Sequence, residues 1–192
     1  MFEFFSEDSM RSEVLHEALL MAARKGVSEI VSFLLEARAA ALCSDVDLQI
    51  ALKEAIQIGS AETVHVLLQR KGESLRMEAR AGALQMACSV GSLEVVDLLL
   101  KEGGVSAGAV DLPDGYGGTA LIAAAAAGKG DIVRVLLNAG ADRTCRNTRG
   151  ETALDIAIRR GQKGVVKILQ PSLSSHVVSL FSISFMSYCT LC

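Results

Sequence analysis

The chain has 192 residues, of which 51% are hydrophobic, and a formal net charge of −3. This length permits one or two domains, and the small negative charge argues against a nucleic acid partner, which requires a basic surface. Five cysteines without a framework spacing exclude a disulfide scaffold and predict a reducing compartment, the cytoplasm or the nucleus.

Residues 1–11 are expected to form an N-terminal cap segment. They begin with MFEFF, which lacks the basic flank and the long apolar stretch of a signal peptide. The first unit of a stacked array has an open face that an internal unit does not have. Phe2, Phe4 and Phe5 are therefore expected to pack against that face.

A glycine-centred phrase then occurs five times, at spacings of 33, 32, 37 and 33 residues. Each phrase has an alanine-rich apolar stretch before the glycine, and a β-branched pair with leucines or isoleucines after it. Apolar residues at positions i, i+3 and i+4 are typical of a helix with one buried face, and glycine can adopt the positive φ that ends a helix. The sequence predicts five helix–turn–helix units, whose phrases are residues 19–35, 52–68, 84–100, 121–137 and 154–170.

Both helices of each unit are predicted to bury a pair of neighbouring residues against the next unit, because no single helix pair can cover its own apolar stripe. The first-helix pairs are Ala22-Ala23, Ala55-Ile56, Ala87-Cys88, Ala124-Ala125 and Ala157-Ile158. The second-helix pairs are Ile30-Val31, Thr63-Val64, Val95-Val96, Ile132-Val133 and Val165-Val166.

Over residues 12–170 the chain resembles the ankyrin repeat family. The fourth unit is the most similar, with Thr119-Ala120-Leu121 near the family's Thr-Pro-Leu-His segment and residues 139–142 reading AGAD. The resemblance implies an all-α ankyrin-repeat solenoid of stacked helix-turn-helix units. Its five repeats are expected at about 12–44, 45–76, 77–113, 114–146 and 147–170.

The first three repeats depart from the family pattern. The family threonine falls at Glu17, Ile50 and Gly82, and its histidine falls at Leu20, Lys53 and Gln85. The resemblance implies that the hydrogen bonds from one turn to the next are lost there. The N-terminal half is therefore predicted to open before repeats four and five.

A glycine-rich segment of residues 101–118 interrupts the period between repeats three and four and predicts an enlarged hairpin or loop. Tyr116 falls at its tip, on the edge where ankyrin proteins present variable residues. An exposed tyrosine at such a place is a frequent interface anchor, so Tyr116 is a candidate partner-binding residue. The alternative is a loop aromatic with no partner.

The C-terminal end of the array is basic, since residues 143–170 hold seven arginines and lysines against two carboxylates. The resemblance places Arg149, Arg159 and Arg160 among the turns and first-helix residues that line the family's binding groove. They are candidate partner-binding residues for an acidic protein segment. The alternative is a solvated face with scattered charge.

The candidate motifs for catalysis, cofactor binding or metal binding lack residues that these functions require. Gly128-Lys129-Gly130 lacks the serine or threonine and the upstream glycine of a phosphate loop. The three histidines have no cysteine or carboxylate at ligand spacing, so neither a zinc site nor a nucleophile–base pair is predicted. We therefore expect no enzyme activity, no cofactor and no metal site.

The tail, residues 171–192, has no formally charged residue. Three interpretations remain open: a membrane anchor weakened by seven serines, a cover over the last repeat, or an incidental and aggregation-prone end. Cys189 begins a four-residue end with the form of a prenylation box, although a final cysteine is not a usual last residue.

These observations predict a monomeric protein–protein interaction module that acts as an adaptor or regulator through the concave face and turn tips of the array. The alternatives are a scaffold tethered to a membrane by residues 171–192, and a fragment or isoform of a multidomain enzyme or channel.

Overall fold

The structure is a computed structural model that describes residues 7–36, 44–71, 77–101 and 110–170. The predicted cap residues Phe2, Phe4 and Phe5, the tail and Cys189 lie outside these ranges. The helices are α1 (Glu7–Lys25), α2 (Ser28–Glu36), α3 (Asp45–Ile58), α4 (Ala61–Lys71), α5 (Met77–Val90), α6 (Leu93–Lys101), α8 (Ala120–Ala127), α9 (Gly130–Asn138), α10 (Ala153–Arg159) and α11 (Lys163–Leu169).

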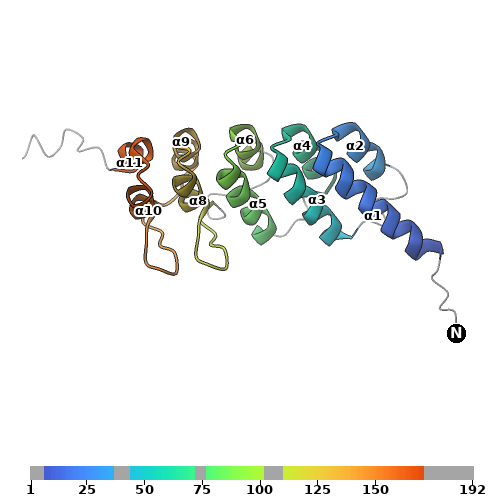
Figure 1. Ribbon diagram of the computed structural model, residues 1–192, viewed down its shortest axis with the longest axis horizontal. Helices are drawn as coiled ribbons and strands as arrows, with labels where there is room; N and C mark the ends of the chain where they lie inside the picture. Colours follow the sequence, from blue (N-terminus) through green and yellow to red (C-terminus); the bar gives the residue numbers. More distant parts are fainter. Residues whose placement is uncertain (1–6, 37–43, 72–76, 102–109, 171–192) are drawn as a thin grey trace, which may run out of the picture.

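These helices stack as pairs in two rows (Figure 1). One row holds the first helix of each pair, α1, α3, α5, α8 and α10, and the other holds α2, α4, α6, α9 and α11. Each helix contacts its own partner and its neighbours in the same row. Within the described ranges there is no β-strand, so the expected all-α solenoid is confirmed.

The glycine turns that join the two helices of a pair have the predicted conformation. Gly59 ends α3 with a φ of 79°, and its N–H donates to the carbonyls of Ala55 and Ile56. Gly128 ends α8 with a φ of 72°. An L side chain rarely adopts this conformation, which explains why glycine recurs at these turns.

The predicted stripes form one continuous core along the array. The first-helix leucines Leu19, Leu84 and Leu121 are buried, as are the small residues that follow them. Thr63 is also fully buried, and its hydroxyl oxygen accepts a hydrogen bond from Ser60 Oγ at 2.9 Å. Burial of a polar side chain is tolerated when it is hydrogen-bonded, so this threonine fits the stripe.

Two predicted stripe residues are exposed instead. Ile30 is 50% exposed, although Thr63, Val95, Ile132 and Val165 at the same position are buried. Ile158 is 57% exposed, although its equivalents Ala23, Ile56, Cys88 and Ala125 are buried. The reason is their place in the stack: in the described residues no helix pair precedes α1–α2 and none follows α10–α11.

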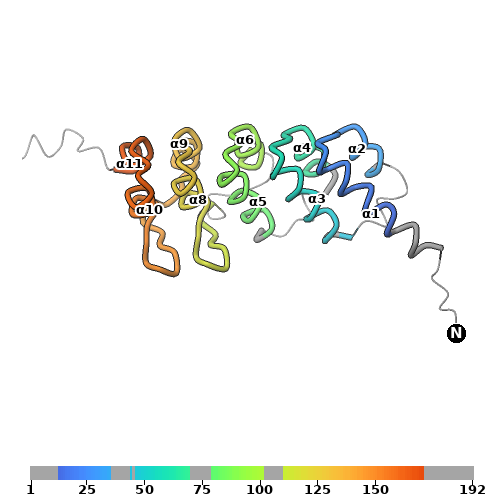
Figure 2. Tube along the Cα trace, in the orientation of Figure 1, coloured from blue at the N-terminus to red at the C-terminus, as the bar shows by residue number. Residues whose placement is uncertain are grey.

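The first three repeats differ from the last two in how the first helix begins. Thr119 and Thr152 are the N-caps of α8 and α10, and each accepts a hydrogen bond from a backbone N–H of the first turn. The helices α3 and α5 start upstream of the corresponding positions, Ile50 and Gly82, which lie inside them. A longer first helix thus takes the place of the hairpins that precede α8 and α10 (Figure 2).

The predicted loss of hydrogen bonds between turns is wrong for repeat three. Gln85 stands at the family's histidine position, and its Nε2 donates to the carbonyl oxygens of Leu112 at 2.8 Å and Gly118 at 2.9 Å. Both carbonyls belong to the segment that leads into α8. The amide group reaches the same kind of acceptor that a histidine would, so α5 and the repeat-four hairpin are tied together.

Candidate protein-binding surface

The hairpin before α8 is held in shape by Asp114. Its carboxylate oxygen Oδ1 accepts hydrogen bonds from the backbone N–H groups of Tyr116 at 2.8 Å and Gly118 at 2.6 Å. The backbone N–H of Asp114 donates to the carbonyl of Gly118, which closes the turn. Tyr116 lies at this tip with 79% of its surface exposed, whereas residues 102–109 of the predicted enlarged segment lie outside the described residues.

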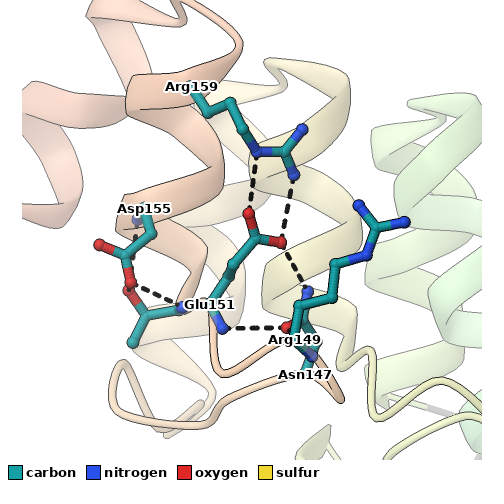
Figure 3. Close-up of polar contacts among 6 residues, drawn as sticks. Asn147, Arg149, Glu151, Asp155 and Arg159 are labelled. Carbon is teal, nitrogen blue, oxygen red and sulfur yellow. Dashed lines mark hydrogen bonds and ion pairs between the residues drawn. The ribbon is translucent and has the colours of Figure 1, made fainter.

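The hairpin before α10 is built in the same way around Asn147. Its Oδ1 accepts hydrogen bonds from the backbone N–H groups of Arg149 and Glu151, both at 2.9 Å. The side chain of Arg149 is exposed at the tip and, in the described part of the chain, forms no ion pair (Figure 3). A fixed backbone therefore carries a guanidinium that is available to a partner.

The two tips are joined to each other. The N–H of Thr148 donates to the carbonyl of Tyr116 at 3.0 Å. The tip glycine Gly117 has a φ of 70°, and a Cβ at this residue would lie only 3.0 Å from the Thr148 nitrogen. Close packing of the two backbones thus places Tyr116 and Arg149 on adjacent, connected hairpins.

Arg159, the third candidate arginine, is paired within the fold. Its Nε donates to Glu151 Oε1 at 2.9 Å and its Nη2 donates to Glu151 Oε2 at 3.2 Å (Figure 3). This bidentate pair connects the end of α10 to the hairpin that precedes it. The side chains of Asn147 and Arg159 donate to the Glu151 carboxylate and hold its pKa below the ordinary value of 4.5.

The lowered pKa of Glu151 predicts a pH dependence of stability. Because the folded-state pKa lies below the unfolded one, ionised Glu151 stabilises the fold above pH 4.5, and this contribution is lost as the pH falls through the folded-state pKa. We expect a Glu151→Gln variant to melt below the parent at pH 7 and the difference to vanish in acid. Thermal melts of the parent and the variant from pH 7 into acid measure this difference, and Glu94→Gln, at an exposed residue, is the control. A difference in melting temperature that does not depend on pH would contradict the prediction.

Arg160 also has an intramolecular partner. Its Nη1 donates to the carbonyl oxygen of Ala126 in the preceding repeat at 3.2 Å, while the residue remains exposed. One hydrogen bond uses one of the five donors of a guanidinium. Arg160 is therefore positioned by α8 and keeps donors for a partner, whereas the Nε and Nη2 donors of Arg159 are occupied by Glu151.

A hollow of about 360 Å³ lies between α5 and α8, on the same surface as the hairpins. It is lined by Gly82, Gln85, Met86, Ser89, Asp114, Gly118, Thr119, Ile122, Ala123 and Ala126. This hollow was not predicted from the sequence. The signal for it is the run of five alanines from 123 to 127, whose side chains are small.

The described ranges were also compared with the requirements of a metal site, a membrane-spanning helix and a reactive thiol. No group of three or more histidine, cysteine, aspartate or glutamate residues is placed to hold a metal ion there. No helix in those ranges has both the length and the apolar character needed to cross a bilayer. Burial raises the pKa of the Cys88 thiol to about 12, so this thiol is not a nucleophile at neutral pH.

The structure is that of a helical repeat protein. One of its surfaces carries the two hairpins and the hollow. Residues 84–178 match the family model for ankyrin repeats, in three copies. The chain belongs to the ankyrin repeat family, whose repeats are generally protein–protein interaction modules.

Two relatives share part of this array. The chain is 46% identical over 78 residues to the mouse tRNA endonuclease ANKZF1, a match that covers 38% of this chain and 10% of that protein. It is 32% identical over 92 residues to an ankyrin repeat protein of Rickettsia bellii, strain RML369-C, which covers 47% of this chain and 55% of that protein. The matched region thus spans about a tenth of the first relative and about half of the second.

Proposed function

We propose that this protein is an adaptor or regulator that binds a protein partner through the hairpin tips and first-helix surface of repeats three to five. The observation that supports it best is the backbone link between the two tips, which fixes Tyr116 and Arg149 as neighbours. A rigid site loses less conformational entropy on binding than a flexible loop does. An exposed tyrosine and a guanidinium without an ion pair are the residue types that dominate binding energy in interfaces.

The partner segment that fits this surface is acidic. Arg149 and Arg160 lie on it with donors to spare, while Arg159 is neutralised by Glu151 and belongs to the scaffold. Attraction between exposed charges is screened over about 8–10 Å at physiological ionic strength. We therefore expect binding to weaken as salt is raised.

The test uses peptides selected from a display library against the folded array, with affinity measured by titration. We expect Tyr116→Ala combined with Arg149→Glu to weaken binding by about tenfold or more, which corresponds to about 1.4 kcal/mol. Lys167→Glu is the matched control because it makes the same charge change on exposed surface of α11, in the other helix row. The proposal fails if the tip variant binds as the parent does, or if the control weakens binding equally while the helical signal is unchanged.

Binding rather than catalysis is proposed as the activity of this chain, in the cytoplasm or the nucleus, with the array as a monomer. The repeats generally act as protein-binding modules, and burial keeps the Cys88 thiol protonated at neutral pH.

A second candidate is that the array serves as the interaction segment of a larger enzyme. The observation that favours it is the 46% identity to a stretch of the mouse tRNA endonuclease. That stretch is 10% of the relative, so the similarity covers a small part of that endonuclease. Transcript sequencing across this locus separates the two candidates, because an enzyme would require a further coding region joined to this one.

A further inference from the structure

The hollow between α5 and α8 arises from a local deficit of side-chain volume. Five residues before the turn glycine the other repeats carry Met21, Glu54, Met86 and Ile156, and repeat four carries Ala123. Two residues before the glycine they carry Arg24, Gln57, Ser89 and Arg159, and repeat four carries Ala126. Both alanines line the hollow, so repeat four carries only methyl groups at two positions where most other repeats carry longer side chains.

The polar side chains that line the hollow are already engaged within the fold. Gln85 donates to two carbonyls and Ser89 donates to the carbonyl of Met86 at 2.8 Å. Asp114 Oδ1 accepts two backbone N–H groups, and Thr119 Oγ1 accepts the N–H of Ile122. The rest of the lining is glycine, alanine, methionine and isoleucine, so the walls favour an apolar group.

A positive charge stands at the repeat-five side of the hollow. Arg160 donates to the carbonyl of Ala126, which places its guanidinium beside a residue of the wall. On the hairpin side, the tip that holds Tyr116 rises from Asp114 and Gly118, which also line the hollow. The surroundings are therefore asymmetric, with a cation on one side and an aromatic tip on the other.

We infer that this hollow receives one large apolar side chain, such as leucine, methionine or phenylalanine, from a partner segment that carries an acidic residue on the repeat-five side. The inference rests on the proposed function and specifies the sequence of its partner. A volume of about 360 Å³ has room for one such side chain, and the surface that lines it is mostly apolar. The acidic residue would pair with Arg160, and Arg149 would extend the same basic strip.

The first experiment selects random 12-residue peptides on the folded array and sequences the binders. We expect the selected peptides to share one large apolar residue with an aspartate or glutamate close to it in the sequence, on either side. Synthetic copies in which the apolar residue is changed to serine, or the acidic residue to lysine, should each bind about tenfold more weakly. Binders without an apolar residue, or copies that tolerate the change to serine, would overturn the inference.

The second experiment fills the hollow by changing Ala126→Met. The side chain should occupy the space and weaken binding of the selected peptides about tenfold, with an unchanged helical signal. Gln57→Met is the matched control, because it puts the same side chain at the same position of repeat two, where the residue is exposed. Ala123→Met provides a second variant if Ala126→Met reduces the helical signal.

The outcomes separate this inference from the proposed function. If the change of Tyr116 and Arg149 weakens binding but the filled variants bind normally, the hollow inference is wrong and the tip surface stands. If the filled variants and the tip variant all lose binding, both are supported. If peptides bind equally to all of them, both are wrong.

Discussion

A Leu121→Ala variant is expected to lose about 2–5 kcal/mol of unfolding free energy, the usual cost of removing a buried leucine side chain. Leu121 is only 1% exposed, in a helix that packs between α5 and α10. The smaller residue would leave a cavity at the centre of the stack, where both neighbouring repeats contribute to the core. Urea denaturation followed by circular dichroism measures this loss.

Leu154→Ala is the matched control for this substitution. Leu154 occupies the same position in α10 but is only partly buried, and in the described residues no helix pair packs against its far side. Its loss should be clearly smaller than that of Leu121→Ala. Equal losses in the two variants, or a loss below about 1 kcal/mol for Leu121→Ala, would contradict the described packing.

A Gln85→Met variant is expected to cost about 1–3 kcal/mol, because it leaves the carbonyls of Leu112 and Gly118 without the donor that both share. Methionine keeps most of the volume, so the loss reports the hydrogen bonds rather than a cavity. The effect should be local: amide hydrogen exchange in α8 and its hairpin should accelerate more than in α1 or α3.

Gln57→Met serves as the control here as well, since Gln57 is exposed on α3 and its replacement should change stability by less than about 0.5 kcal/mol. Faster exchange spread evenly over the array after Gln85→Met would show that the residue does not act as a link between repeats three and four. The same exchange experiment on the parent tests the prediction that the N-terminal half opens first, which would fail if the slowest amides lay in α1 to α4.

The helices and their order could be predicted from the sequence because the same constraint occurs five times. A turn glycine with positive φ and an apolar stripe before and after it specify a helix pair without information from elsewhere in the chain. Leu84 and Leu121, for example, could be assigned to the core from their spacing to Gly91 and Gly128 alone. The burial of both leucines confirms this reasoning.

The two wrong predictions of burial concern residues whose environment depends on a neighbouring repeat. Ile30 and Ile158 have the chemistry of core residues, but their burial requires a helix pair on one particular side. The ion pair of Arg159 is a different case, because it forms inside repeat five and no prediction addressed it. Its pairing with Glu151 depends on the path of a hairpin eight residues earlier, which a helical pattern does not report.

For Gln85 the sequence predicted that a contact is missing, and the structure contains it. Its mismatch to the family histidine predicted a missing link, yet an amide can donate to the same backbone carbonyls. The hollow at Ala123 and Ala126 likewise exists only because no other helix of the described residues covers that face of α8. Positions of this kind are decided by the shape of the assembled stack.

The restriction of helix contacts to nearest neighbours has a consequence for synthesis on the ribosome. Because α1 and α2 contact only each other and the pair α3–α4 among the strongly packed elements, the first repeat has all its partners once residue 71 has emerged, while α3 and α4 still lack α5 and α6. Chains whose contacts are close in sequence fold quickly compared with the rate of translation, about 5–20 residues per second. Growth of the nascent chain would then extend an existing core by one repeat at a time, and the surface at α5 and α8 would be completed only after the hairpin that follows repeat three has left the exit tunnel.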